Sequence, residues 1–288
     1  MYYSPLRYPG GKSKLTPFME MMIRKLNIRN GTYVEPFAGG AGIAIELLLK
    51  GTVDKIIIND YDKAIASFWK AIVYDNSRFI DKMIETPITI EEWYKQREII
   101  NNSSKCSFEL GFATFFLNRT NRSGIINGGP IGGYKQDGEW KLDVRFNKEK
   151  LSERIRAIGK HKHDIKVYNK DVRSLVKNYL NDLNENSLIY FDPPYFEKGK
   201  ELYMNYFTLE DHKEIKELIK KYVKCKWIIT YDDVEEITNI YSEYVIRRFE
   251  LSYSAAKKRT ASEIMIFPNE EICPEETELN IENCINLR

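Results

Sequence analysis

The chain has 288 residues, with 44 Lys and Arg against 42 Asp and Glu, for a formal net charge of +2. This length suits one large domain, or one core that carries a sizeable insertion. A hydrophobic content of 43% excludes a disordered chain, and a mean hydropathy of −0.47 argues against a membrane protein. No apolar run approaches the roughly 20 residues that span a bilayer, and the N-terminus lacks the apolar stretch of a secretory signal.

The four cysteines lie far apart and none forms a Cys-x-x-Cys motif. We therefore expect no disulfide framework, no metal site and a reducing, cytoplasmic location. The charge is unevenly distributed: residues 119–162 hold eleven Lys and Arg against five Asp and Glu, whereas residues 270–288 hold six Glu and one Arg. A basic stretch in a balanced chain fits either a nucleic-acid-binding face or a solvated lysine-rich surface.

Strands and helices alternate at the start of the chain. A strand is predicted at residues 32–37, and a Gly-rich turn and a helix over 43–50 follow it. A second strand over 55–58 leads to another helix, for which Asp62 is the expected N-cap. This order is typical of a parallel sheet.

The middle of the chain breaks this rhythm. Helical periodicity gives way to the Gly-rich run SGIINGGPIGGYKQDGEW, in which an Asp-Gly pair predicts a β-hairpin over Tyr134–Trp140. We interpret residues 76–165 as an insertion and not as a second independent fold.

The alternation then resumes. Strands are predicted at 165–168, 187–191 and 227–231, with a helix over 209–222 and an antiparallel edge pair over 244–250 and 262–267. The acidic residues after Pro268 are expected to be a peripheral tail.

The strand over 187–191 runs directly into Asp192-Pro193-Pro194-Tyr195. Two prolines cannot continue a central strand, so the chain leaves the sheet at the carboxyl end, where open α/β sheets bind ligands. Asp192 and the Pro193 carbonyl can accept both N–H bonds of an exocyclic aromatic amine, and Tyr195 can stack on its ring. The alternative is a simple strand-terminating turn.

A second candidate is the Gly-rich turn Pro36-Phe37-Ala38-Gly39-Gly40-Ala41-Gly42. Its glycines allow a ligand to approach the backbone at a helix N-terminus. Asp60 follows Gly40 by 20 residues, at the end of the next strand, where an acid usually binds ribose hydroxyls. A tight turn and a capping aspartate are the alternative. Near the N-terminus, Gly11-Lys12-Ser13 resembles a P-loop, but Leu6 stands where that motif requires glycine.

Taken in order, these segments resemble the Dam-like family of DNA adenine-N6 methyltransferases. The matching pieces are YPGGKSKL, EPFAGGAG, IINDYD, FFLNRTNRSGI, YFDPPY and EIMIF. The resemblance implies a class I S-adenosylmethionine-dependent methyltransferase fold, a Rossmann-like seven-stranded sheet with helices on both faces. It predicts a discontinuous catalytic domain (1–75 and 166–268), an inserted target-recognition domain (76–165) and an acidic tail (269–288).

The resemblance also implies roles for individual residues. Those expected to hold S-adenosylmethionine, and its product S-adenosylhomocysteine, are Tyr8, Lys12, Phe37, Gly39, Asp60, Asp171 and Asp192. The target adenine is expected to contact Asp192, Pro193 and Tyr195, and Arg7 falls where some relatives place a base-contacting lysine. Tyr8-Pro9 and the predicted hairpin depart from the best-known relatives, so no recognition sequence is carried over.

The chemistry expected of these residues is direct transfer. The lone pair of adenine N6 is delocalised, and two acceptors on its hydrogens would stabilise the positive charge that develops on attack. The base must leave the duplex to be reached, and Tyr195 is the expected stacking platform. Methylation of cytosine C5 would need a nucleophilic cysteine, and no motif contains one.

Sequence reading is assigned to the insertion. Asn118, Arg119, Asn121 and Arg122 suit adenine and guanine edges, Tyr134 lies in the predicted hairpin, and Arg145 and Lys148 suit phosphates. The alternative for each of these side chains is a surface salt bridge.

Two other functions remain open at this level: a methyltransferase of the same fold acting on rRNA or a protein glutamine, and a catalytically silent DNA-binding protein. Asp192 and the basic insertion favour DNA over the first, and the retained site residues argue against the second. The expected partner is double-stranded DNA, with no membrane, and the chain is expected to be a monomer or a weak dimer. A cognate restriction endonuclease, an orphan epigenetic mark and a phage anti-restriction role all stay open.

Overall fold

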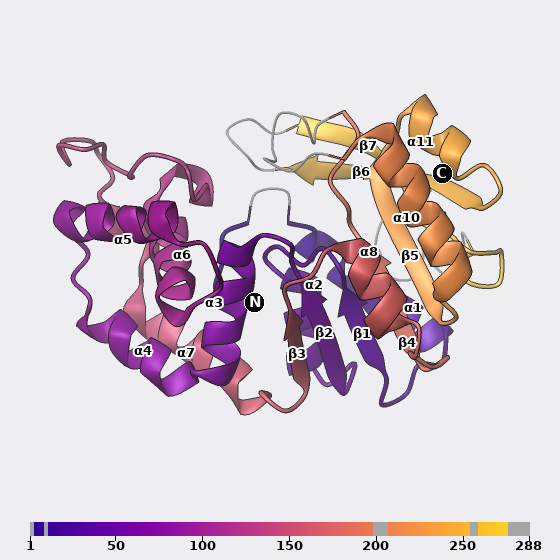
Figure 1. The fold of residues 1–288 in the computed structure, drawn as a ribbon, viewed down its shortest axis with the longest axis horizontal. Coiled ribbons are helices and arrows are strands. Elements are labelled where there is room, and N and C mark those ends of the chain that lie inside the picture. The colour runs from indigo at the N-terminus through magenta and orange to yellow at the C-terminus, as the bar shows by residue number, and fades with distance from the viewer. Residues whose placement is uncertain (1–2, 9–10, 198–206, 254–258, 276–288) are drawn as a thin grey trace.

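The computed structural model describes residues 3–8, 11–197, 207–253 and 259–275. Within them, seven strands form one sheet in the order β3-β2-β1-β4-β5-β7-β6 (Figure 1). The strands are β1 (Thr32–Glu35), β2 (Lys55–Asn59), β3 (Ile165–Tyr168), β4 (Ser187–Phe191), β5 (Lys226–Asp232), β6 (Val245–Tyr253) and β7 (Arg259–Phe267). β1 to β5 pair in parallel, and β7 runs antiparallel between β5 and β6. The predicted strands and their edge pair are confirmed.

Helices cover both faces of the sheet because successive strand residues point to opposite sides. On one face Tyr33 packs with α1 (Thr16–Lys25), α2 (Gly42–Leu49) and α3 (Lys63–Tyr74). On the other face Val34 packs with α8 (Val172–Leu175), the adjoining turn η4 (Val176–Leu180), α10 (Leu209–Tyr222) and α11 (Glu235–Ile240). The central strands are therefore buried on both sides.

Local caps begin two of the predicted helices where expected. The Asp62 carboxylate accepts a hydrogen bond from the backbone N–H of Ala64 at 2.8 Å, as the N-cap of α3. Thr208 and Asp211 form a reciprocal capping box at the start of α10.

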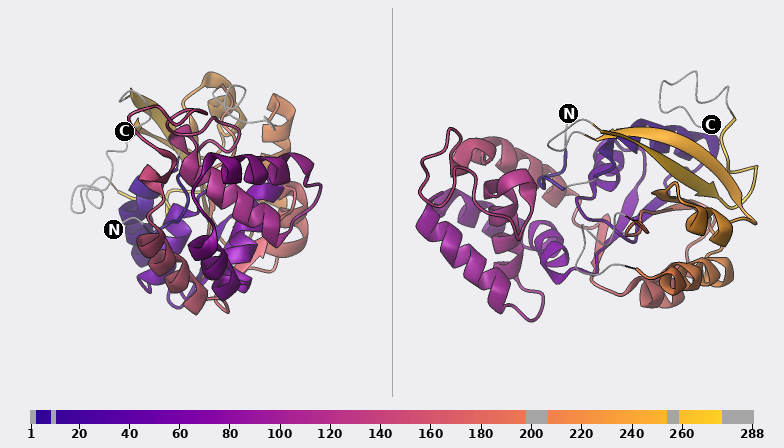
Figure 2. Two further views of the ribbon diagram at one scale, coloured as in Figure 1. Left: turned by 90° about the vertical axis from the view of Figure 1, so that its left-hand side faces the viewer. Right: turned by 90° about the horizontal axis from the view of Figure 1, so that it is seen from above.

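The insertion lies at the β3 end of the sheet, on the left of Figure 1 and of the view from above in Figure 2. It contains α4 (Asn76–Glu85), α5 (Ile90–Asn102), α6 (Phe108–Thr120), α7 (Lys148–Lys160), and the short turns η2 (Arg122–Gly124) and η3 (Leu142–Arg145). Helix α6 packs closely on α3, because Gly111 allows the backbone of Ser67 to approach: a Cβ there would lie 2.4 Å from the Ser67 carbonyl oxygen. The same apolar core runs through both parts.

The predicted hairpin over Tyr134–Trp140 is wrong. This segment forms successive turns, since the Gln136 side chain donates to the carbonyls of Ile131 and Gly133 and accepts from the N–H of Leu142. Gln136 also has a positive φ of 52°, which interrupts an extended chain. The side chain of Gln136 thus makes hydrogen bonds to backbone groups that would have paired with each other in a two-stranded hairpin.

Candidate active site

The predicted site residues that follow β1, β2 and β4 meet at the carboxyl edge of the sheet. Gly39 follows β1 and Asp60 follows β2: the Gly39 N–H donates to Oδ2 of Asp60 at 2.9 Å. The N–H of Asp62 donates to the other Asp60 oxygen at 2.9 Å. Burial raises the pKa of Asp60 to about 7, although both hydrogen bonds favour its ionised form.

The N-terminal segment lies against the Gly-rich turn. Gly39 has a φ of 47°, and a Cβ there would lie 2.6 Å from the Tyr8 ring. At Gly40 a Cβ would lie 2.8 Å from Cβ of Tyr8, so glycine is required at both positions. The Gly39 carbonyl accepts from the Trp69 indole at 2.8 Å, which ties the turn to α3. The structure thus brings Tyr8 and the turn together.

Asp192 lies at the end of β4, beside Thr230 of β5. The Thr230 hydroxyl donates to Oδ1 of Asp192 at 3.0 Å, and the Thr230 oxygen is also 2.7 Å from the Tyr190 hydroxyl. The ammonium of Lys12 lies 3.7 Å from the same Oδ1 atom. Burial raises the pKa of Asp192, while the positive charge of Lys12 opposes that shift.

A second carboxylate, for which the sequence predicts no role, completes the cluster. Glu263 of β7 is fully buried and its Oε2 accepts from Lys12 at 2.9 Å and from the Tyr195 hydroxyl at 2.7 Å. Lys12 also hydrogen-bonds the Tyr195 hydroxyl and lies 4.5 Å from the centre of its ring. The only sequence signal for Glu263 is a charged residue inside the apolar run EIMIF.

Glu35, at the end of β1, is another buried carboxyl that sequence reasoning missed. Its Oε1 accepts from the N–H of Ala44 in the first turn of α2 at 3.0 Å. Burial raises its pKa to about 8. Its place directly before Pro36-Phe37 could have marked it as a residue of the Gly-rich turn.

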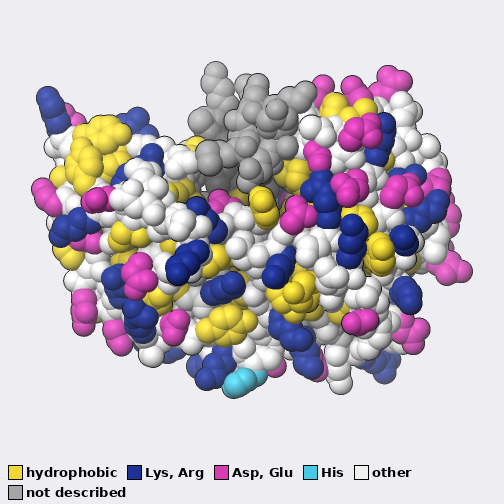
Figure 3. All heavy atoms as spheres, viewed as in Figure 1, with side chains coloured by type: hydrophobic (Ala, Val, Ile, Leu, Met, Phe, Trp, Pro, Cys, Tyr) yellow, Lys and Arg dark blue, Asp and Glu magenta, His cyan; other side chains and the backbone are white. Residues whose placement is uncertain are grey.

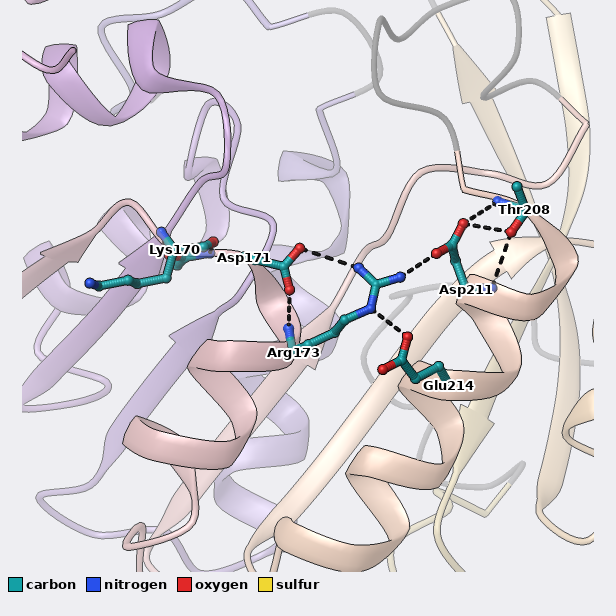
Figure 4. Close-up of polar contacts among 7 residues, drawn as sticks. Lys170, Asp171, Arg173, Thr208, Asp211 and Glu214 are labelled. Carbon is teal, nitrogen blue, oxygen red and sulfur yellow. Dashed lines mark hydrogen bonds and ion pairs between the residues drawn. The ribbon is translucent and has the colours of Figure 1, made fainter.

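Asp171 follows β3 and caps helix α8, as Figure 4 shows. One oxygen accepts from the Arg173 N–H at 2.8 Å and the other from the Arg173 guanidinium at 3.2 Å. The same guanidinium pairs with Asp211 and with Glu214, so it joins the start of α8 to the start of α10. Asp171 remains at the carboxyl edge of the sheet, with a partly exposed side chain.

The two asparagines of the insertion do not face outward. Asn118 accepts from the Arg7 N–H at 2.8 Å and donates to the carbonyls of Arg7 and Gly124 at 2.9 and 2.8 Å. Asn121 accepts from the Trp93 indole and donates to the carbonyls of Ile125 and Ile126. Asn118 and Asn121 are 1% and 0% exposed, so their amides hold the segment that follows α6 and are not available to base edges.

The other residues assigned to DNA differ in their surroundings. Lys148 donates to the carbonyls of Ile84 and Thr86, at the end of α4. Arg119 is partly buried and donates to the Pro5 carbonyl at 3.5 Å, whereas Arg122 and Arg145 are exposed. Arg7 is partly buried, and burial together with the charge of Arg145 lowers its pKa.

Hydrophobic side chains gather at the outer end of the insertion, among Lys and Arg (Figure 3). Tyr134 is 58% exposed, and its ring stacks at 6.3 Å on that of Tyr94, which is 53% exposed. An aromatic pair in a basic setting can contact sugars or bases.

Residues 8–258 match the family described as D12 class N6 adenine-specific DNA methyltransferase. The chain belongs to this family. It is 26% identical over 224 residues to the "Type II methyltransferase M.MjaIII" of Methanocaldococcus jannaschii, which covers 73% of this chain and 74% of that protein.

Two solved structures of the rRNA methyltransferase aviRa from Streptomyces viridochromogenes align with 92% of this chain and 88% of theirs. They are 11% and 12% identical to this chain, with TM-scores of 0.35 and 0.38.

This D12-class enzyme is an adenine-specific DNA methyltransferase that depends on S-adenosylmethionine, and DNA is its substrate. Its seven-stranded sheet, with the last strand antiparallel, has the class I methyltransferase fold that the sequence predicts. No helix in the described ranges is long and apolar enough to cross a membrane. Those ranges also hold no group of three or more His, Cys, Asp or Glu side chains suited to a metal ion.

The residues at the sheet edge fit S-adenosylmethionine chemically. Glu35, Asp60 and Asp192 are carboxyls whose pKa burial raises, so each gains from a ligand that supplies hydrogen-bond donors or positive charge. The cofactor offers ribose hydroxyls, an ammonium group and a sulfonium. The glycines beside Tyr8 keep the backbone open to close approach.

Proposed function

We propose that Asp192, Pro193 and Tyr195 receive an adenine that has been flipped out of double-stranded DNA. The observation that carries the proposal is the arrangement of the Asp192 carboxylate. Within the described residues, both contacts of its side chain fall on Oδ1. This leaves Oδ2 to accept an N–H of the adenine amino group.

The second N–H of that amine is assigned to the Pro193 carbonyl. Two acceptors draw electron density toward N6 and favour the tetrahedral geometry of attack. The ring of Tyr195 supplies the stacking surface for the unpaired base. The bound cofactor supplies a sulfonium-activated methyl group, so the protein acts by orienting the amine and stabilising its developing positive charge.

The cofactor is assigned to the residues around the Gly-rich turn and Lys12. Asp60 is assigned to the ribose hydroxyls, and its two backbone donors favour its carboxylate form. Tyr8, Phe37 and Gly39 line the turn, and Asp171 is assigned to the adenine of the cofactor. S-adenosylhomocysteine is the expected product.

DNA reading is assigned to the exposed part of the insertion and to the N-terminal segment. Arg122 and Tyr134 are the candidates best placed to reach bases, since both are exposed. Arg145 is assigned to phosphate, while the buried contacts of Asn118 and Asn121 suit them to support the segment. Arg7 and Arg119 are also assigned to contacts with DNA.

The proposal divides the chain into a catalytic domain of residues 1–75 and 166–268 and a recognition domain of residues 76–165. Residues 269–275 of the acidic tail are described, and the rest of that tail lies outside the described residues. We further propose that the enzyme acts as a monomer or weak dimer, with a cognate endonuclease as its partner in a restriction–modification system.

The decisive test compares Asp192→Ala with Asp233→Ala in cells that express each full-length protein. Asp233 is a matched control, because it is a carboxylate near the site that pairs with Arg248 at 3.0 Å. Single-molecule mapping of genomic DNA should find N6-methyladenine at one short motif with the control and none with Asp192→Ala. Methylation that survives in a folded Asp192→Ala variant would refute the assignment.

A further inference from the structure

Glu263 is a charged residue buried where an apolar one would pack. It lies on β7 directly before Ile264, Met265 and Ile266, with a relative exposure of 0%. In the register of β5 and β7 it stands opposite Asp232, a second buried acid. Burying two like charges opposite one another is unfavourable, so we expect each carboxylate to have partners that offset this cost.

Both acids hold the chain that follows Asp192. Asp232 accepts from the N–H groups of Phe196 and Glu197 at 3.0 and 2.9 Å. Glu263 accepts from the hydroxyl of Tyr195 at 2.7 Å. Strands β5 and β7 therefore fix the backbone that follows Tyr195 and the direction of the Tyr195 ring.

Glu263 also determines where the charge of Lys12 lies. The ammonium is 2.9 Å from Oε2 of Glu263 but 3.7 Å from Oδ1 of Asp192. Its side chain is 4% exposed, so no bulk water screens this choice between two carboxylates. A closer approach to Asp192 would neutralise the group that accepts the substrate amine.

We propose that Glu263 is a positioning residue for methyl transfer, which holds Lys12 away from Asp192 and orients Tyr195 through its hydroxyl. This inference rests on the proposed role of Asp192 and adds to it a second carboxylate that does not touch the substrate. Glu263 acts through the lysine and the tyrosine, both of which it hydrogen-bonds.

The proposal makes a distinct prediction for pH dependence. Among the described residues, the charged and titratable groups around Asp192 include Lys12, Glu263, Glu35, Tyr33, Tyr190, Tyr195 and Tyr231. Burial is the main cause of the raised pKa of Asp192, and the charge of Glu263 adds to it. Removal of that charge should lower the pKa of Asp192 and move the acid limb of the kcat profile to lower pH.

The test is Glu263→Gln in the full-length enzyme, assayed by transfer of a labelled methyl group to genomic DNA from cells without adenine methylation. We expect kcat to fall about tenfold, less than the roughly 10²–10³-fold that follows loss of a group on the reacting centre. The acid limb of the profile should shift downward at the same time. Thermal unfolding and cofactor binding by calorimetry establish that the variant is folded.

Tyr195→Phe is the companion variant, since it keeps the ring and removes only the hydroxyl. It should reduce kcat, and the double variant Glu263→Gln/Tyr195→Phe should lose less than the two single losses combined. Normal kcat in Glu263→Gln would overturn the inference. Additive losses with an unmoved pH profile would also overturn it, because they indicate a purely structural role. If Asp192→Ala itself stays active, the proposed function fails instead.

Discussion

The carboxyls of Glu35 and Asp60 have raised pKa values because the folded chain removes them from water. The pKa of Glu35 rises from 4.5 to about 8, mainly through burial. A carboxyl in this state is held at an energetic cost when ionised, and the cost is accepted where the group serves a ligand. The cofactor assigned to this edge supplies the donors that would offset it.

This shift predicts how stability depends on pH. Because the folded state binds the Glu35 proton more tightly than the unfolded state, its contribution is present at low pH and is lost as pH rises toward 8. In the wild-type enzyme, Glu35 should lower the free energy of unfolding by up to about 1.4 kcal/mol per pH unit between roughly pH 5 and 8. We expect Glu35→Gln to remove this part of the slope. Denaturant unfolding of the cofactor-free enzyme across that range measures the slope. The control Glu98→Gln, at an exposed position, should keep the wild-type slope. A wild-type slope in Glu35→Gln would contradict the raised pKa of Glu35 as its cause.

Residues close together in sequence were predicted more successfully than residues that meet only in the fold. The strand ends at Asp60 and Asp192 follow from local patterns of hydrophobicity, glycine and proline. Glu263 could not be found this way, because its partner Lys12 is 251 residues away. A single sequence holds no record of such a contact.

At the scale of the elements, the segment that follows α6, residues 121–127, is held by side chains instead of by strands. Asn118 and Asn121 bind it from within, and Arg97 of α5 donates to the carbonyls of Ile126 and Asn127. Residue type does not reveal burial, so the sequence predicts base contacts for two asparagines that the fold buries. The wrong hairpin prediction has a related cause: the side chain of Gln136 satisfies the backbone that a strand would have paired.

This division of roles predicts opposite effects for two neighbours. Asn118→Ala leaves buried groups of Arg7 and Gly124 unpaired, so it should lower the free energy of unfolding by about 1–3 kcal/mol. Arg122→Ala removes an exposed side chain, so it should preserve stability and weaken specific DNA binding by about 1–3 kcal/mol. Thermal melts measure the loss of stability, and fluorescence anisotropy with DNA that contains the enzyme's target motif measures the loss of binding. The reverse pattern would show that Asn118 is the reader.

Across the whole molecule, one apolar core joins the insertion to the sheet. The ring of Phe115 on α6 stacks on Phe68 of α3 at 5.9 Å and meets Phe79 and Phe146 edge-on. The core does not stop at the boundary that the sequence predicts between domains, so the two parts should stabilise each other.

We expect Phe115→Ala to destabilise the enzyme by about 3–5 kcal/mol, because it empties a fully buried ring site. The insertion and the sheet should still unfold together in one transition. Hydrogen exchange followed by mass spectrometry can test this, since peptides from α6 and from β4 should lose protection in parallel. Loss confined to the insertion would show two independent units, and Ile84→Ala, at an exposed position, serves as the control.

The pairing of Lys12 with Glu263 has a consequence for how the enzyme matures. The two residues are separated by 251 positions, and β7 enters the sheet between two strands that precede it in the chain. During synthesis, Lys12 cannot meet Glu263 until β7 has left the ribosome. A nascent or prematurely terminated chain can form much of the sheet but lacks the buried partner of its lysine. With the role proposed for Glu263, competence to modify DNA is thus reserved for molecules in which β7 has been translated and has entered the sheet.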